Sequence, residues 1–230
     1  MSHVLYTPDT AQWPEQWDEM PAENIVEGTP KHRMIEFGEF RGGPLGVWQL
    51  TPGLSGGVAD EPELIVILDG GDTTFRLSDG EGHTLAPGTT MRVDIGSRDS
   101  FEVRETMTEF WFYPPAGGGE NTGEIVTQIT AELTPDNFFT DEQRGGLDVH
   151  TAIKEIGTIE GVAYGIWQMG AGAADWVTED EVFIIESGKG TLTFEDGEVV
   201  DLAPGTVVRL VDGEKVRWDI SEQIRKVWIG

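Results

Sequence analysis

The 230-residue chain contains no cysteine and only four histidines. The absence of cysteine excludes disulfides, thiolate metal sites and cysteine nucleophiles, and it is compatible with a reducing compartment. Residues 1–17 show neither a basic start nor an apolar run, and no stretch approaches the roughly 20 apolar residues of a membrane span. We therefore expect a cytoplasmic protein without a signal peptide.

Basic residues are also scarce. The chain has 15 Lys and Arg against 42 Asp and Glu, which gives a net charge of −27. A field of this sign repels phosphate backbones and anionic lipid surfaces, so neither nucleic acid nor a membrane is expected as a partner. A solvated acidic surface accounts for the charge without a specific basic partner.

Internal repetition is the strongest signal that the chain does carry. Residues 71–96 align without a gap to residues 188–213, with 12 of 26 positions identical, where unrelated sequences would share about one or two. The match continues on both sides with GVWQ at 46–49 and GIWQ at 165–168, and with Trp111 and Trp228. The offset of 117 residues is too long for a solenoid, whose units span about 20–50 residues.

The repeat therefore predicts two complete domains, at residues 1–115 and 116–230. Units of this size can bury a core without disulfides. The segment 114–124, PPAGGGENTGE, is rich in proline and glycine without apolar periodicity, as expected of a linker.

Short β-branched and aromatic runs, separated by glycine-rich turns, dominate both copies. Asp79-Gly80 and Asp196-Gly197 each stand between two such runs. Because Asp-Gly supplies the positive φ angles of a type I′ turn, we predict a tight hairpin at each. Many short strands with little helical periodicity indicate an all-β sandwich or barrel.

Each copy has, in order, a strand with tryptophan, an acidic residue at the start of a strand, a glycine, a DG hairpin and an APGT turn. This pattern resembles that of the cupin superfamily. The chain is most similar to the small-cupin subfamily that includes the ureidoglycine aminohydrolase and ethanolamine-utilisation cupins. The matching residues are Gly46, Trp48, Pro52, Gly53, Glu63, Gly70, Pro87, Gly88, Gly96 and 101–103 in the first copy, and Gly165, Trp167, Gly172, 180–181, Gly188, Pro204, Gly205, Gly213 and 218–220 in the second. The resemblance implies two tandem double-stranded β-helix (jelly-roll) barrels, an arrangement called a bicupin.

Metal-dependent members of this family use two histidines two residues apart, a nearby glutamate and a distant histidine. Glu63 and Glu181 fill the glutamate position. The histidine positions fall at Gly57, Ala59 and Asp99 in the first copy and at Asp175, Val177 and Val216 in the second. Because none is histidine, we expect metal-free barrels without a cofactor. An oxygen-only set of Asp175, Glu179 and Glu181 is a lesser alternative that would suit Ca²⁺, Mg²⁺ or Mn²⁺.

The mouths of the barrels are the expected ligand sites. Candidate pocket residues are Trp48, Glu63, Arg92 and Trp111 in the first copy, and Trp167, Trp176, Glu181, Phe183, Arg209, Trp218 and Trp228 in the second. The aromatic residues suit either core packing or an aromatic-walled pocket. Arg92 and Arg209 share one repeat position. Facing inward, they would pair with the family glutamates or clamp a ligand carboxylate; facing outward, they would form surface ion pairs.

Three functions remain open at this point, and no motif marks catalytic residues. The leading prediction is a protein that binds a small carboxylate- or amide-bearing molecule in a metal-free barrel, with the second copy as the first place to search. The second is an enzyme of the ureidoglycine aminohydrolase type, or another cupin enzyme, working with or without a metal. The third is an interaction module that forms a homodimer through its barrel sheets.

Overall fold

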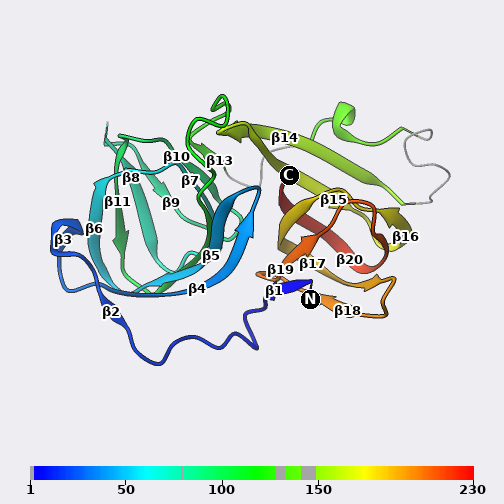
Figure 1. Cartoon of the computed structure of the whole chain (residues 1–230), viewed down its shortest axis with the longest axis horizontal. Helices are drawn as coiled ribbons and strands as arrows, with labels where there is room; N and C mark the ends of the chain where they lie inside the picture. The colour runs from blue at the N-terminus through cyan, green and yellow to red at the C-terminus, as the bar shows by residue number, and fades with distance from the viewer. Residues whose placement is uncertain (1–2, 79, 128–132, 141–148) are drawn as a thin grey trace. The chain divides into compact units, whose positions relative to one another are not determined.

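The structure is a computed structural model that describes residues 3–78, 80–127, 133–140 and 149–230 (Figure 1). The chain divides into two compact units. The N-terminal unit comprises Gln12–Gln128 and Thr158–Gly161, and the C-terminal unit comprises Met1–Ala11, Ile129–Gly157 and Val162–Gly230. The described residues 3–11 are thus grouped with the C-terminal unit, whereas the predicted boundary at 115/116 assigns them to the first domain.

The N-terminal unit consists of two antiparallel sheets. One has the order β13-β10-β7-β12-β5-β4-β2, and the other has the order β3-β6-β11-β8-β9. The strands of the first sheet are β2 (Asp18–Glu19), β4 (Lys31–Phe40), β5 (Gly43–Leu50), β7 (Glu63–Asp69), β10 (Thr90–Val93), β12 (Met107–Phe112) and β13 (Val126–Thr127). Those of the second are β3 (Ile25–Glu27), β6 (Gly53–Val58), β8 (Thr73–Leu77), β9 (Gly82–Thr84) and β11 (Arg98–Val103). The chain crosses between the two sheets several times, for example from β7 to β8 and from β11 to β12.

The C-terminal unit is built around two long strands, β17 (Glu181–Phe194) and β20 (Lys215–Ile229), which pair with each other. Its other strands are β1 (Val4–Tyr6), β14 (Thr151–Ile159), β15 (Val162–Met169), β16 (Gly172–Val177), β18 (Val199–Leu202) and β19 (Val207–Leu210). The register between β17 and β20 shifts from Ile185 to Gly190. These irregularities bend both strands at the point where the equivalent strands of the N-terminal unit are interrupted.

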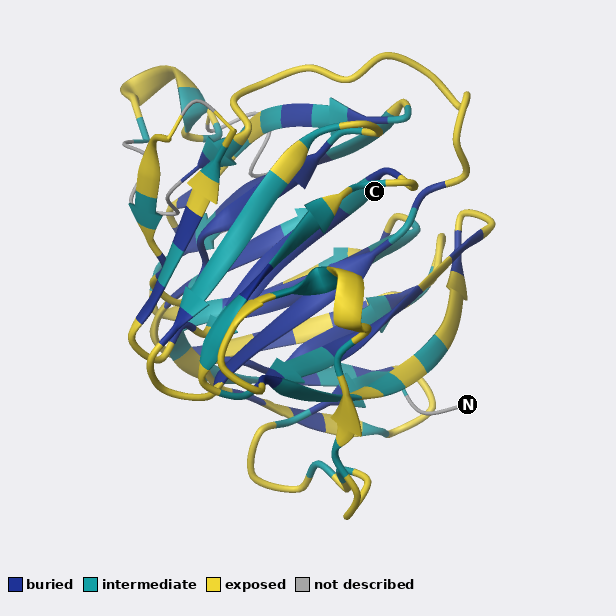
Figure 2. Cartoon of the chain, turned by 90° about the vertical axis from the view of Figure 1, so that its left-hand side faces the viewer, coloured by how far each residue is buried: buried dark blue, intermediate teal, exposed yellow. Residues whose placement is uncertain are grey.

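Alternation along the strands places the core inside each unit. In β20, Val216, Trp218 and Ile220 are buried while the residues between them are exposed, as a period of two requires. Figure 2 shows buried residues along the strands of the N-terminal unit and exposed residues at its turns. The prediction of an all-β chain of two jelly-roll barrels is confirmed.

Helical structure is minimal. Among the described residues the helical elements are two 3₁₀ turns, η1 (Ala22–Asn24) and η2 (Pro135–Asn137). In this part of the chain no helix is long and apolar enough to cross a membrane.

Both expected hairpins are present, but the turn type was predicted wrongly. β17 and β18 pair directly, and only Gly197 of the Asp196-Gly197 turn has a positive φ, at 90°. Phe194 N–H donates to Glu198 O at 2.9 Å and Gly197 N–H to Phe194 O at 3.0 Å. This pattern is a three-residue loop with a glycine bulge. The first copy has the same pattern around Gly80, whereas Asp79 lies outside the described residues.

A tryptophan lies against a glycine of the neighbouring strand in each unit. Trp228 pairs with Gly165, and Trp111 pairs with Gly46. A Cβ built on Gly165 would lie 2.3 Å from Lys154 O and 2.7 Å from Trp228 Cζ2. The repeated glycine therefore provides the space for the repeated indole.

We predict that Gly165→Ala destabilises the C-terminal unit by roughly 1–3 kcal/mol, because the added methyl group overlaps the backbone of β14 and the indole. Gly170→Ala is the matched control, since its nearest neighbour would be His150 O at 3.7 Å, and we expect a change within about 0.5 kcal/mol. Urea unfolding followed by tryptophan fluorescence measures both. Equal effects of the two substitutions would contradict this account.

Candidate functional site

The C-terminal unit contains a pocket of about 200 Å³. Its lining residues are Phe139, Ile153, Trp167, Trp176, Thr178, Glu179, Glu181, Leu210, Trp218 and Lys226. Trp167, Trp176, Glu181 and Trp218 belong to the set expected from the sequence. The walls are mainly aromatic and aliphatic, and a few charged groups converge on the cavity, as in many small-molecule sites.

Lys226 is the central polar group of this pocket, although the sequence analysis did not single it out. The residue is only 4% exposed, and its ammonium group forms an ion pair with Glu181. Its Nζ lies 4.3 Å from the ring centroid of Phe183, 5.0 Å from that of Trp167 and 5.3 Å from that of Trp218. The lysine therefore lies in an aromatic cage with one carboxylate as its counter-ion.

The register of β17 and β20 explains this arrangement. Lys226 lies opposite Ile185, on the face that also carries Phe183 and Glu181. Its long side chain reaches along this face to the carboxylate at the start of β17. Burial lowers the pKa of Lys226, while the charge and hydrogen bond of Glu181 act in the opposite direction.

The family metal set does not fit this pocket. The carboxylate of Glu181 is bound by Lys226, and Asp175 forms an ion pair with Arg217 at 3.2 Å. Val177 and Val216 have no donor atoms. A protein cation therefore already occupies the one carboxylate at the family ligand position, and the oxygen-only set expected with Glu179 is not assembled as a metal-compatible group among the described residues.

The remaining candidates of the second copy lie outside the pocket lining. Arg209 donates to Asp180 Oδ1 at 2.5 Å instead of pairing with Glu181. It alternates with Val208 and Leu210, which belong to the hydrophobic core, so it lies on the opposite face of β19. Phe183 is fully buried beneath Lys226, and Trp228 packs against the same core.

The N-terminal unit contains a corresponding cavity of about 330 Å³. Its lining residues are Met20, Pro21, Asn24, His32, Met34, Trp48, Glu63, Ile65, Phe101, Glu109, Trp111 and Tyr113. A second space of about 180 Å³ shares six of these residues and also reaches Gly57, Ala59 and Asp99. Trp48, Glu63 and Trp111 of the expected set therefore come together here.

Three carboxyl groups interact in this cavity. Burial raises the pKa of Glu63, and the charges of Asp99 and Glu61 act in the same direction, against a hydrogen bond from Tyr113. Burial likewise raises the pKa of Asp99, to about 6. Glu109, which is 3% exposed, has a strongly raised pKa because of burial and the nearby charge of Glu63. Its Oε2 has no hydrogen-bond partner in the described part of the chain.

The four family ligand positions do line one cavity in this unit, but they do not fit a transition metal. Gly57 and Ala59 supply no donor, so only the carboxyl groups of Glu63 and Asp99 remain. His32 lines the neighbouring space, where its Nδ1 accepts a hydrogen bond from Trp48 Nε1 at 3.0 Å. Within the described residues these acids form no compact group of metal donors.

Arg92 does not line either of these two cavities. Its Nε forms an ion pair with Asp94 at 3.0 Å, and its Nη1 donates to the backbone oxygens of Thr122 and Gly123. It therefore fastens the segment after β12 to the barrel and does not pair with Glu63.

Sequence reasoning missed two cavity residues, Glu109 and Lys226, although both occupy the same position of the repeat. ETMTEFWF at 105–112 aligns with EQIRKVWI at 222–229, which places Glu109 opposite Lys226. The chain has only five lysines, so one in a hydrophobic strand next to a repeated tryptophan is unusual. A charge reversal at one position of a repeat marks a place where the two copies differ in chemistry.

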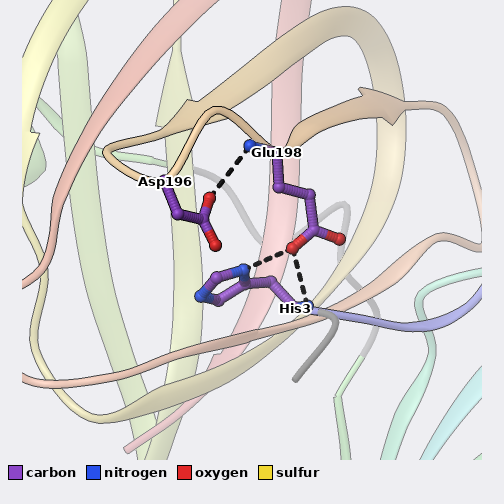
Figure 3. Close-up of side chains that lie close together, drawn as sticks. All are labelled: His3, Asp196 and Glu198. Carbon is purple, nitrogen blue, oxygen red and sulfur yellow. Dashed lines mark hydrogen bonds and ion pairs between the residues drawn. The ribbon is translucent and has the colours of Figure 1, made fainter.

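A separate cluster joins the N-terminal segment to the C-terminal unit (Figure 3). His3 Nδ1 lies 2.6 Å from Glu198 Oε2, and its Nε2 lies 3.1 Å from Glu214 Oε1. The imidazole stacks on Phe194 with ring centroids 3.6 Å apart. His3, Asp196 and Glu198 are close enough to hold a cation, but both ring nitrogens of His3 already have carboxylate partners. The cluster therefore serves to hold β1 beside β19.

Comparisons with known proteins bear on the C-terminal unit most directly. Residues 157–228 match the family model of the EutQ-like cupin domain. The match spans 72 of the 230 residues, so this segment is similar to a cupin domain. The similarity to the ureidoglycine aminohydrolase cupins stays a prediction. The assignment of both units to the cupin family, as a bicupin, also stays a prediction. A search of the curated proteins found no match.

Solved structures show that the fold is similar to that of known proteins. A protein of unknown function from Pseudomonas syringae pv. tomato is similar with a TM-score of 0.65 and 14% identity, covering 98% of this chain and 97% of that one. A cupin 2 conserved barrel domain protein from Leptotrichia buccalis is similar with a TM-score of 0.61 and 9% identity, covering 86% of this chain and 88% of that one. Salicylate 1,2-dioxygenase from Pseudaminobacter salicylatoxidans is similar with a TM-score of 0.60 and 12% identity, covering 86% of this chain and 76% of that one. At these identities the likeness is one of fold alone.

We predict that His3→Gln destabilises the C-terminal unit more at pH 5.5 than at pH 8.5. Burial opposes the charged imidazole, but Glu198 and Glu214 outweigh it and raise the pKa of His3 above its ordinary value. A histidine whose pKa is raised on folding contributes its full stabilisation at pH values below the pKa of the unfolded state, about 6.5. This contribution is lost as the pH rises through the pKa of the folded state. Urea midpoints at the two pH values measure the effect, with the exposed His150→Gln as control. A loss independent of pH would contradict the ion pair.

Proposed function

We propose that this protein binds a small organic molecule in the pocket of its C-terminal cupin domain, through an amide or carboxylate group. The observation that carries the proposal is Lys226, a buried ammonium group at an aromatic-lined cavity of about 200 Å³. Such a group donates strong hydrogen bonds to a carbonyl oxygen in a site of low dielectric constant. The cavity has room for about six or seven water-sized groups, which suits a small metabolite.

The three charged groups of the pocket favour an amide over a carboxylate as the ligand group. Lys226 offers donors, while Glu181 and Glu179 offer acceptors in the same pocket. An amide presents a carbonyl oxygen and N–H groups side by side, so it matches both kinds of partner. A carboxylate would satisfy Lys226 but would face two like charges. The flat rings of Trp167 and Trp218 suit a planar ligand body.

Benzamide and benzoate are a matched pair of probes for this site. At ten times its dissociation constant, benzamide should stabilise the protein by about 1.4 kcal/mol, a rise in melting temperature of roughly 3–6 °C. We expect benzoate to bind at least tenfold more weakly. Isothermal titration calorimetry and thermal shift measure both. Failure of both probes to bind at millimolar concentration would contradict the proposal.

Lys226→Met tests the assigned donor, because methionine keeps an unbranched apolar side chain of nearly the same length but removes the charge. We expect at least a tenfold loss of benzamide affinity, as a charge-assisted hydrogen bond contributes about 1.5–3 kcal/mol. Since the substitution leaves Glu181 without its counter-ion, the double variant Lys226→Met/Glu181→Gln serves where the single variant is unstable. Lys215→Met, at a side chain 70% exposed, is the control. Unchanged affinity in folded Lys226 variants would refute the role of this residue.

A further inference from the structure

The two barrels differ by a reversal of charge at equivalent positions. In the C-terminal unit Lys226 pairs across strands with Trp167, and in the N-terminal unit Glu109 pairs in the same way with Trp48. Both residues line the cavity of their own barrel. The same place in the fold therefore holds a cation in one unit and an acid in the other.

The C-terminal barrel shows what this place accommodates. The ammonium group of Lys226 lies about 5 Å from the ring centroids of Trp167 (5.0 Å) and Trp218 (5.3 Å) and is paired with Glu181. Two aromatic faces and a carboxylate together attract an organic cation. Here the protein supplies that cation from its own chain.

The N-terminal barrel keeps these groups but replaces the cation. Trp48 and Phe101 stand at the positions of the two tryptophans, and Glu63 stands at the family glutamate position. The additional carboxyl group of Glu109 is nine-tenths or more buried, at 3% exposure, and its Oε2 has no hydrogen-bond partner in the described part of the chain. A buried, unpartnered carboxyl oxygen facing a cavity is costly unless a ligand completes it.

We propose that the N-terminal cavity binds an organic ammonium ion, with its charged nitrogen near Glu63 and Glu109 and its carbon skeleton against Trp48 and Phe101. The ammonium supplies the positive charge that Lys226 provides in the other barrel. The apolar residues Met20, Met34 and Ile65, which also line the cavity of about 330 Å³, suit an alkyl chain of several carbons. This site is separate from the C-terminal pocket and stands whether or not that pocket binds an amide.

The lining favours an organic cation over a metal ion. Ca²⁺ and Mg²⁺ take six to eight oxygen ligands at short distance, whereas this cavity is walled largely by indole, phenyl and thioether groups. These groups attract a cation of low charge density through their faces and polarisable sulfur.

Calorimetric titration of the full-length protein at pH 8 with three probes of similar size tests the charge preference. The probes are n-butylammonium, n-butanol and butyrate. We expect n-butylammonium to bind at least tenfold more tightly than n-butanol, and butyrate not to bind. Equal affinity for n-butylammonium and n-butanol, or tighter binding of butyrate, would overturn the proposal.

Variants at Glu109 locate the binding to this cavity. Glu109→Gln should weaken n-butylammonium binding at least tenfold, and Glu109→Lys should abolish it, because the new side chain carries a cation into the same place. Glu105→Gln, at an exposed residue of the neighbouring turn, should leave it unchanged. Circular dichroism establishes that each variant folds, and Glu63→Gln replaces any that does not. Full affinity in folded Glu109→Gln or Glu63→Gln would overturn the assignment.

Discussion

The antiparallel pairing of β17 with β20 is the interaction on which the C-terminal unit depends. The two strands pair from Val182 opposite Ile229 to Phe194 opposite Val216. Their ladder runs along both strands, with shifts of register between Ile185 and Gly190. The same register carries Lys226 to Glu181, so the pocket chemistry follows from the pairing that builds the fold. In the N-terminal unit shorter strands divide this task between two sheets.

Each barrel buries an ionisable group on a central strand of its sheet, Glu109 on β12 and Lys226 on β20. The two copies stabilise this group differently. In the second copy an opposite charge within the chain compensates the buried ammonium. In the first, burial raises the pKa of Glu109 well above its ordinary value, so a cation beside this carboxyl group is needed to favour its charged form. A duplicated fold can thus retain its core while a single position changes the electrostatic character of the cavity. The aromatic neighbours tolerate both solutions because a ring face accepts a cation and also packs against a neutral acid.

The sequence predicted the all-β class and the jelly-roll architecture, because the repeat, the alternating strands and the glycine turns are local signals. Of the seven pocket candidates that it named in the second copy, Trp167, Trp176, Glu181 and Trp218 line one cavity, and their role in binding a ligand stays a prediction. It did not identify Lys226 or Glu109, since a charged residue in a strand is ordinarily assigned to the exposed face. The direction in which Arg209 points was equally undetermined, because it depends on the phase of a four-residue strand. The turn type at Asp196-Gly197 depended on one φ angle that Asp-Gly does not fix.

The attachment of β1 to β19 has a consequence for how the molecule is made. During translation, Val4 leaves the ribosome about 200 residues before Val208, the residue with which it pairs. The intervening N-terminal barrel contains all its own strand partners and is free to fold first. Strand β1 has no partner until then, and it pairs with β19 at the edge of the sheet only when synthesis of the second barrel is nearly complete.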